Sequence, residues 1–420
     1  MSADRKRQAQ RMQSILLDVG LINCIGRTKT DFYNAYFVEQ KSGLRSCSKL
    51  DSVFSLGLVP TDWYIHEALP HPYNNRINKL ALCACRQIEP LVHLAKQKYG
   101  AERIGIVVGT TDNGSEETNT FLSGVMRGSG EHDEKKAAGT SGEADYNPYV
   151  LDMQCLGLCA EYLSHFFGVS GFSSTISTAC TSSAHAISRA DELLKSDICD
   201  VVIAGGVDIV SDVVLGGFSS LEAVDTHTTT PFSKNRRGIN LGEGAAFFVM
   251  AKENFTDAKD TIFLKGASDN ADAFHMTSPD VSGTAAAACI QTALQRAHLS
   301  ISDIDYINLH GTGTELNDQM ESRAVNLIEA SAIPCSSSKT ALGHTLGAAG
   351  AMELAVCYLA LSELNQQRIL PPHFYDGIYD LDLPAIRLVT DKIIAERLNT
   401  VMSFSFAFGG NNACLIIGRG

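Results

Sequence analysis

Short, continuously apolar runs rich in β-branched residues alternate along the chain with longer stretches rich in alanine and leucine. An apolar run without polar alternation is typical of a strand that is buried on both faces of a sheet, whereas the longer stretches have the length of helices. We expect strands at 14–22, 103–110, 200–208 and 245–251, and helices at 77–97 and 182–196. This alternation predicts an α/β protein with mostly parallel sheets.

The second half of the chain repeats this order of elements. Residues 304–312 are expected to form a strand, residues 335–361 a small-residue loop that leads into a helix, and residues 400–418 two strands around a Gly-Gly turn. A repeated plan of this size predicts two similar halves that bury a shared core. The predicted halves are residues 1–255 and 256–420.

Composition and charge narrow the possible classes of function. The 420 residues are 45% hydrophobic, which is enough to bury one large core or two fused cores. The net charge of −13 argues against a general nucleic-acid-binding protein. No run reaches the roughly 18 apolar residues of a membrane span, and no apolar stretch of signal-peptide length follows the charged N-terminus. We therefore expect a cytoplasmic protein, with the polar residues 127–146 in an exposed loop.

The twelve cysteines form no CxxC pair, and most of them lie within apolar runs. This placement is typical of buried free thiols in a reducing compartment. A zinc site would need paired ligand spacing, which the sequence lacks. We expect neither disulfides nor a bound metal.

Cys180 differs from the other cysteines in its surroundings. Small residues flank it, and an expected helix begins two positions later, in the stretch STISTACTSSAHAISRADELL. The free N–H groups and the dipole at a helix N-terminus favour a negative charge, which would lower the pKa of this thiol and make it a nucleophile. The stretch alone is equally compatible with a packed core cysteine.

Two histidines and a lysine occupy similar junctions in the second half. His310 ends an expected strand in NLHGTGTELND, at the place where α/β proteins bind ligands. The GxGxxG motif of dinucleotide-binding proteins does not fit there, because its third glycine would fall at Leu316. Lys339 and His344 lie five residues apart in SSKTALGHTLGAAGAMEL. Each could be structural by itself, but such residues at matching junctions of two halves favour one shared site.

The motifs that carry this pattern resemble those of a known family. They are ISTACTSSAHAI, TPFSKNRRGINLGEGAA, DAFHMTSP, LHGTGTELNDQMES, SSKTALGHTLGAAGAMEL and SFAFGGNNA. In this order they are similar to motifs of the β-ketoacyl-acyl-carrier-protein synthases, the decarboxylating condensing enzymes of the thiolase fold. The resemblance runs from about residue 14 to the end of the chain. It implies two similar βαβ-type halves whose sheets sandwich buried helices in five layers, α-β-α-β-α.

The resemblance also implies an activity and the residues that perform it. A 3-oxoacyl-[acyl-carrier-protein] synthase of fatty-acid or polyketide biosynthesis condenses malonyl-carrier with a cysteine-bound acyl chain. Cys180 would be the acyl-accepting nucleophile, His310 and His344 would bind the malonyl thioester carbonyl, and Lys339 would order the site electrostatically. The backbone N–H groups of Cys180 and Phe408 would form the oxyanion hole. Such an acyltransferase needs no metal or other cofactor.

Further residues receive roles from the same resemblance. Thr312 and Thr314 match threonines that hydrogen-bond the phosphopantetheine arm of the carrier. Asp318 and Glu321 match acidic residues that support the site, and Phe408 matches an aromatic gate beside the cysteine. Phe404 stands where the family has asparagine, so we expect it to make the wall of the acyl pocket more apolar. Such departures favour a specialised synthase, for example one that builds aryl polyenes or other polyketides.

The resemblance makes an acyl carrier protein the expected partner, in addition to a second copy or a ketosynthase-like chain in a dimer. Carrier proteins are acidic, so this acidic chain is expected to present local basic residues to them. The candidates are Arg76 and Lys79, together with Arg236 and Arg237. Each could equally form an ordinary salt bridge.

Three alternatives remain open at the level of sequence. A non-decarboxylating thiolase-type enzyme would pair its cysteine with a histidine and a second cysteine or an asparagine. A non-catalytic chain-length factor would lack the active-site cysteine, although this chain could be the catalytic partner of one. A thiol hydrolase would use Cys-His-Asp or Cys-His-Asn, which would leave Lys339 and the second histidine unexplained.

Overall fold

The computed structural model describes residues 13–63, 68–126, 150–256 and 261–420. Its described part contains one large sheet of eleven strands, in the order β11-β10-β9-β12-β13-β8-β1-β7-β6-β4-β5. The strands are β1 (Ser14–Ile22), β4 (Ile104–Gly109), β5 (Ser173–Ile176), β6 (Val201–Asp208), β7 (Gly244–Lys252), β8 (Ile262–Ala271), β9 (Tyr306–Asn308), β10 (Pro334–Ser336), β11 (Arg387–Leu388), β12 (Thr400–Phe406) and β13 (Asn411–Arg419). A separate hairpin pairs β2 (Arg45–Lys49) with β3 (Ser52–Leu56).

The large sheet consists of two half-sheets that meet at its centre. Strands β1 and β8 join them by three antiparallel residue pairs, from Ser14↔Leu264 to Leu16↔Ile262. The inner strands β7, β1, β8 and β13 pair antiparallel, whereas β4, β5 and β6 in one half and β9 to β12 in the other pair parallel. The prediction of mostly parallel sheets is therefore wrong for the inner strands. A continuously apolar run shows that both faces of a strand are covered, but it does not show the direction of the neighbouring strands.

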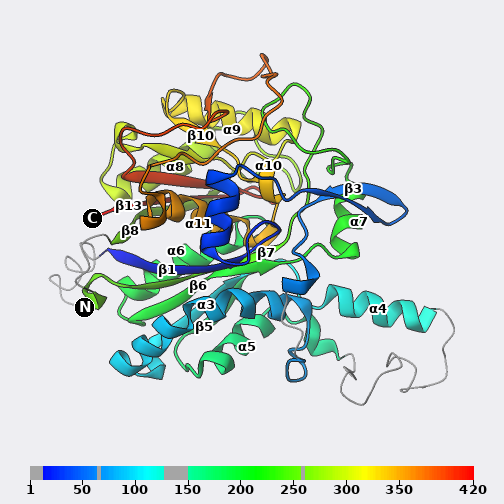
Figure 1. Ribbon diagram of the computed structural model, residues 1–420, viewed down its shortest axis with the longest axis vertical. Coiled ribbons are helices and arrows are strands. Elements are labelled where there is room, and N and C mark those ends of the chain that lie inside the picture. Colours follow the sequence, from blue (N-terminus) through cyan, green and yellow to red (C-terminus); the bar gives the residue numbers. More distant parts are fainter. Residues whose placement is uncertain (1–12, 64–67, 127–149, 257–260) are drawn as a thin grey trace.

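Helices cover both half-sheets and fill the space between them (Figure 1). The α-helices are α2 (Lys29–Tyr33), α3 (Arg76–Tyr99), α4 (Ser115–Met126), α5 (Leu158–Phe167), α6 (Ser182–Lys195), α7 (Asp212–Ser220), α8 (Thr284–Ala297), α9 (Glu315–Leu327), α10 (Lys339–Leu342) and α11 (Ala349–Leu361). Helices α3 and α5 pack on the first half-sheet, α8 packs on the second and on α9, and α6 packs against α11 in the middle. This arrangement has the five layers expected of a thiolase-like fold.

Helix α11 is buried at every position, from Ala349 to Leu361. A helix that is apolar on all sides must be covered on all sides, so this sequence suits the central layer. Its one charged residue, Glu353, is only 2% exposed. No helix in the described part of the chain combines the length and the apolar character of a membrane span.

Most expected elements match the structure to within two residues. The exception is the strand expected at 304–312, of which only Tyr306–Asn308 is a strand. Beyond it, His310 to Thr312 leave the sheet and enter the site. The loop expected at 127–146 lies outside the described residues, and the division after residue 255 stays a prediction.

Gly109 at the end of β4 positions the start of α6. A Cβ atom added at Gly109 would lie 2.4 Å from the backbone nitrogen of Ser183, next to the turn that carries Cys180. We expect Gly109→Ala to lower the free energy of unfolding by roughly 2 kcal/mol, because backbone atoms cannot move aside as a flexible side chain can. Urea unfolding measures this change.

The matched control for this prediction is Gly157→Ala. The added Cβ would meet only Cys155 Sγ at 3.7 Å, an ordinary contact. We expect its midpoint of unfolding to stay near that of the wild type. Equal stability of the Gly109 and Gly157 variants would show that the approach of α6 to β4 is not tight.

Candidate active site

Cys180 lies in a sharp turn between β5 and α6, and its side chain is buried. Ala179 adopts a φ of 53°, in the left-handed region that non-glycine residues rarely enter. Ser182 holds this turn from the first turn of α6: its hydroxyl donates to the Ala179 carbonyl at 2.6 Å and accepts from the Thr178 N–H at 2.9 Å. The turn thus places the sulfur at the N-terminus of a buried helix, as the small residues around it predict.

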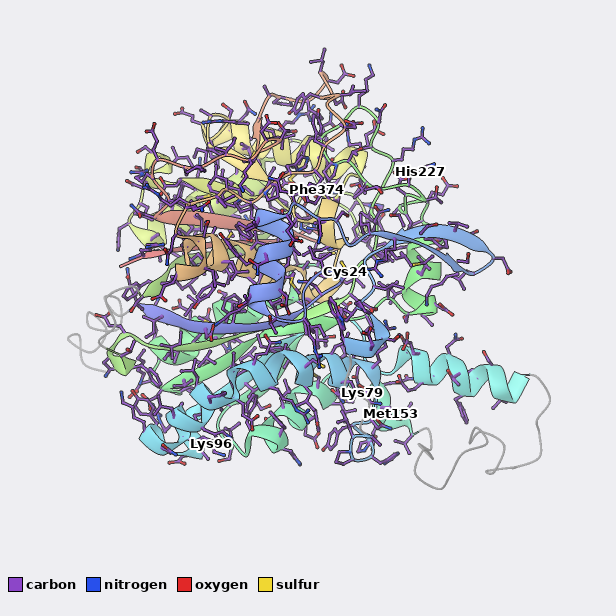
Figure 2. All side chains as sticks on the ribbon, in the orientation of Figure 1. Cys24, Lys79, Lys96, Met153, His227 and Phe374 are labelled. Atoms are coloured by element: carbon purple, nitrogen blue, oxygen red, sulfur yellow. The ribbon has the colours of Figure 1, made fainter. Side chains whose placement is uncertain are left out.

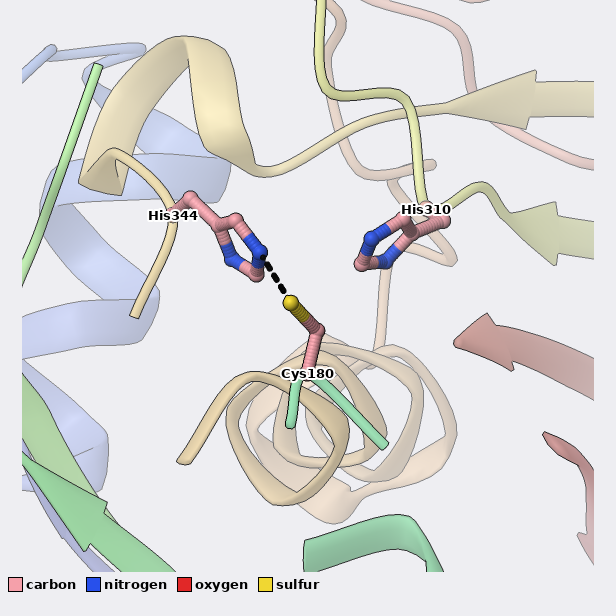
Figure 3. A group of neighbouring side chains, drawn as sticks. All are labelled: Cys180, His310 and His344. Carbon is pink, nitrogen blue, oxygen red and sulfur yellow. Dashed lines mark hydrogen bonds between the residues drawn. The ribbon is translucent and has the colours of Figure 1, made fainter. Parts of the chain in front are cut away.

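The two histidines flank this sulfur (Figure 3). His344 Nε2 lies 3.0 Å from Cys180 Sγ, and the rings of His310 and His344 are perpendicular with centroids 5.2 Å apart. One ligating atom from each of the three residues lies within 4.8 Å of the others, a spacing that a metal ion could also bridge. The buried Lys339 ammonium beside His310 disfavours a divalent cation there, so we interpret the group as an acyl-transfer site.

Buried carboxylates on α9 hold the loop that carries His310. Glu321 accepts the N–H groups of His310 and Gly311 at 2.6 and 2.7 Å. Asp318 accepts the N–H groups of Phe232 and Gly313 at 2.8 and 3.2 Å. These contacts satisfy backbone N–H groups that no strand or helix satisfies. Both acidic residues are therefore in a position to support the loop that carries His310.

The loop that carries His344 is held from two sides. The His344 N–H donates to the Asn240 carbonyl at 2.7 Å, and the following Gly347 N–H donates to Asp208 Oδ2 at 2.6 Å. Gly343 has a φ of 73°, and a Cβ atom added there would lie 2.7 Å from the Leu241 carbonyl oxygen. Glycine therefore lets this loop pass close to the Leu241 backbone. The sequence analysis missed Asp208, whose position at the end of an apolar strand was its only signal.

Lys339 links His310 to a residue that the sequence analysis also missed. Its ammonium donates to the His310 carbonyl at 2.5 Å, lies 3.2 Å from His310 Nδ1, and forms an ion pair with Glu353. Lys339 is 2% exposed and Glu353 equally so. A single charged residue within the apolar helical run AGAMELAVCYLAL was the signal that could have identified Glu353.

Both histidines are held in the neutral form. Burial lowers the pKa of His310 and of His344 well below the ordinary value, and the Lys339 charge lowers both further. His310 Nδ1 faces the Lys339 ammonium, which can only donate, so the neutral ring carries its proton on Nε2. The ring can therefore donate a hydrogen bond at that nitrogen.

The expected lowering of the Cys180 pKa is wrong for the resting thiol. Burial raises the pKa of Cys180 to about 12, although the Lys339 charge and a hydrogen bond from the Phe408 N–H act in the opposite direction. The desolvation of the buried sulfur, which the prediction did not include, is the largest influence on this pKa. The thiol must therefore lose its proton to a nearby base when it reacts, and His344 Nε2 is placed to accept it.

Two cavities meet at Cys180. The first, of about 410 Å³, is also lined by His310, His344, Thr312 and Thr314. The second, of about 550 Å³, is also lined by Cys180, together with residues of α7 and Leu346.

Phe408 and Phe218 line both cavities, and their rings stack at 5.8 Å between centroids. Phe408 therefore lies where a gate beside the cysteine would lie. Sequence analysis missed its partner Phe218, because nothing along the chain connects α7 with the turn after β12.

Phe404 does not line either cavity, so the expected effect on the acyl pocket wall is wrong. It is fully buried in β12, with its ring 6.0 Å from that of Phe406. Phe406, two residues later on the same face, is the one that reaches the first cavity. The asparagine position of the family motif thus belongs to the core of this chain.

The basic residues expected to receive a carrier differ in their surroundings. Arg76 forms ion pairs with Glu243 and with Glu116, and the side chain of Arg236 is 6% exposed and pairs with Asp380 at 2.5 Å. The expectation that these two arginines present unmatched charge is therefore wrong, because acidic partners neutralise them. Lys79 is half-buried on α3 (Figure 2).

Arg237 alone among the four candidates is exposed and also lines the first cavity. Its place at the mouth of that cavity keeps it as the candidate for a docking contact.

Comparisons with known proteins agree with this geometry. Residues 93–255 match the family model described as "Beta-ketoacyl synthase, N-terminal domain", and residues 262–374 match "Beta-ketoacyl synthase, C-terminal domain". Nodulation protein E of Rhizobium meliloti is 32% identical over 81% of this chain and 82% of its own length. The 3-oxoacyl-[acyl-carrier-protein] synthase 2 of Coxiella burnetii is 29% identical over 98% of this chain and 99% of its own.

Solved structures give the same result. The ketosynthase ApeO of Xenorhabdus doucetiae, in complex with its chain length factor ApeC, aligns with a TM-score of 0.86 and 35% identity, over 98% of this chain and 99% of the other. The ishigamide ketosynthase/chain length factor aligns with a TM-score of 0.82 and 26% identity, over 98% and 100%.

The neutral state of the two histidines leads to a pH prediction. A histidine with a depressed pKa stays neutral from high pH down to that lowered value. We therefore expect the ring signals of His310 and His344 to stay constant between pH 5.5 and 8 in NMR spectra of protein with ¹³C-labelled histidine. His310→Gln and His344→Gln assign the two signals, and a histidine peptide titrated in parallel is the control. A midpoint near pH 6.5 for either signal would contradict the prediction.

Proposed function

The chain belongs to the β-ketoacyl synthase family of condensing acyltransferases, and we propose that it joins a malonyl group on an acyl carrier protein to an acyl chain on Cys180, with loss of CO2. The observation that carries this proposal is the buried thiol flanked by two neutral histidines. The pair of cavities that meet at the sulfur supports it, since the reaction brings two chains to one atom.

The first step loads the acyl chain. Cys180 gives its thiol proton to His344 Nε2, 3.0 Å away, and the thiolate attacks the carbonyl carbon of an acyl thioester. The Phe408 N–H, which lies within hydrogen-bonding reach of the sulfur, and the Cys180 N–H stabilise the oxyanion of the tetrahedral intermediate. The thiolate of the carrier arm leaves and takes up the proton from His344.

The second step forms the carbon–carbon bond. The malonyl thioester loses CO2, and its carbonyl oxygen gains the negative charge of an enolate. Neutral His310 donates a hydrogen bond to that oxygen, and His344 does so in the tautomer that carries its proton on Nε2; each bond is worth about 3 kcal/mol by comparison with other oxyanion donors. The enolate carbon attacks the acyl-Cys180 thioester, the sulfur leaves as the thiolate, and a proton from solvent restores the Cys180 thiol. Lys339 keeps His310 in its donating form throughout.

The two cavities divide the substrates between them. The first cavity would hold the phosphopantetheine arm near Thr312 and Thr314, whose hydroxyls lie 2.9 Å apart, and Arg237 at its mouth would meet the carrier. The second would hold the acyl chain of the thioester. This chemistry uses only substrates linked to a carrier and requires no metal or other cofactor.

A dimer with a second ketosynthase-like chain fits the exposed surfaces. Strand β5 is the last strand of the described sheet, so its outer edge is available for pairing. Helix α4 projects from the body (Figure 1), and its side chains Leu122 and Val125 are 50% and 57% exposed. The ketosynthase–chain length factor complexes among the similar structures support a heterodimer, and a second copy of this chain is the alternative partner. Either assembly would work in the cytoplasm, in a fatty-acid or specialised polyketide pathway.

The alternative activities fit the site less well. A thiolase-type enzyme would pair its cysteine with one histidine and a second cysteine or an asparagine. Here two histidines flank Cys180, and Cys180 is the only cysteine among the described residues that line the two cavities, although Asn317 lines the first. A thiol hydrolase would need a carboxylate or amide behind its histidine. In the described structure His310 Nδ1 lies 3.2 Å from the Lys339 ammonium and 3.9 Å from the Glu353 carboxylate, which is too far for a direct hydrogen bond, and His344 Nδ1 has no hydrogen-bond partner.

The nucleophile is tested by Cys180→Ala. We expect no acyl adduct at residue 180 and no condensation product, with unchanged folding because small residues surround the site. His310→Ala or His344→Ala should block the release of CO2 from malonyl-carrier. Acyl loading should survive in His310→Ala and fall in His344→Ala, which lacks the base that takes the Cys180 proton. Mass spectrometry of protein and products, with a panel of acyl primers, measures both. Wild-type product yield from the alanine variant at 180 would exclude this mechanism.

The docking contact is tested by Arg237→Glu. A charge at the rim of an interface acts mainly on the rate of encounter, so turnover with an acidic carrier should fall several-fold at low salt and recover as salt is added. Lys392→Glu changes the charge equally at an exposed residue that lines neither cavity. Equal rates for the two variants at low salt would place the carrier elsewhere.

A further inference from the structure

One wall of the second cavity contains a glycine, Gly217, between larger apolar residues. Helix α7 contributes Val214, Gly217 and Phe218 to this wall, and Leu221 follows directly after its last residue. Residues three, four and seven positions apart lie on the same face of a helix. Gly217 is therefore in the middle of the wall, between larger apolar residues, and it adds no side chain.

Neither the backbone nor the packing of α7 requires glycine at this position. Gly217 is not among the residues with a positive φ, so an ordinary side chain suits its conformation. Gly217 is exposed and lines the second cavity, and a Cβ atom added there would meet no atom of the described residues within 4 Å. Glycine is also less favourable in the interior of a helix than every other residue except proline. The space beside Gly217 is thus the feature that remains to explain it.

The preceding glycine is different and offers a comparison. Gly216 does not line either cavity, and a Cβ added there would lie 3.6 Å from Leu50 Cδ1, in the hairpin of β2 and β3. Alanine at 216 would therefore make an ordinary contact away from the acyl cavity. The two substitutions change helix propensity equally but differ in where the added carbon points.

The second cavity suits an apolar chain attached to Cys180. Cys180 is part of its lining, and Leu346, Phe408 and the α7 side chains make most of the remaining surface apolar. A long chain that starts at the sulfur must run along this wall. The open space beside Gly217 lies on that route.

We infer that Gly217 is a specificity-determining residue that admits long apolar acyl chains to Cys180. Its hydrogen atom leaves room for a segment of the chain, and any larger side chain would project into that room. The inference rests on the proposed function only for the identity of the nucleophile and its acyl group. It concerns which acyl groups the thiol accepts, and it can be measured without the condensation step.

The experiment measures acyl loading alone. The wild type and variants are incubated with acetyl, octanoyl or dodecanoyl thioesters of N-acetylcysteamine. In each reaction Cys180 exchanges its thiol proton for the acyl group, and free N-acetylcysteamine is released. The rate at which the adduct appears is followed by mass spectrometry, and Cys180→Ala gives the background from other thiols.

We expect Gly217→Leu to lower the ratio of dodecanoyl to acetyl loading by about 10- to 100-fold, since small changes in an apolar pocket have effects of this size. Gly217→Ala should lower it less. Gly216→Ala should keep the wild-type ratio, as should Val213→Leu, which adds bulk on α7 outside the cavities.

An unchanged ratio in a folded Gly217→Leu variant would overturn the inference. If that variant does not fold, Gly217→Ala decides by the same ratio, because helix propensity favours its folding. A wild type that loads none of the three chains would also overturn it. Condensation with malonyl-carrier is measured separately. If condensation fails but acyl loading still depends on chain length as expected, the proposed function is wrong and the role of Gly217 is supported.

Discussion

Burial of the Lys339 ammonium is the constraint on which the geometry of the site depends. An ion removed from water costs several kcal/mol unless charged and polar partners replace its hydration. Here the partners are the Glu353 carboxylate, the His310 carbonyl and the His310 ring. They come from α11 and from the loop after β9, so satisfying one charge fixes two segments relative to α10. Burial lowers the pKa of both histidines most, and the same charge lowers both further and moderates the high pKa of Cys180.

Three other buried carboxylates hold the loops of the site by accepting hydrogen bonds from backbone N–H groups. Glu321, Asp318 and Asp208 are all 0% exposed, and each accepts N–H groups from a loop that ends at the site. Burial raises the pKa of Glu321 to about 8, which shows how much of their hydration these groups have lost. These hydrogen bonds make the loops rigid. A rigid loop holds its hydrogen-bond donors in position before negative charge develops on the substrate.

Sequence analysis identified the residues whose signal is local and missed those whose role depends on distant contacts. Cys180 stood out because small residues surround it just before an expected helix, and His310 because it ends an expected buried strand. Glu353 and Phe218 did not, since their partners are brought to them only by the fold. Phe404 and the charge on Arg236 were misjudged for the same reason: burial beside Phe406 and pairing with Asp380 are facts of packing. The direction of the Cys180 pKa was wrong because desolvation cannot be judged from neighbours in sequence.

Helix α11 has a consequence for how the chain folds. It belongs to the second half of the sequence, yet it packs against α6 of the first half, and all of its residues are buried. Neither half by itself could cover this helix, so the first half without it would expose the face of α6, and the second half would expose α11. The two halves of the chain therefore repeat a topology but fold as a single cooperative unit. Within it, α6, which follows Cys180, and α11, which carries Glu353, become ordered together.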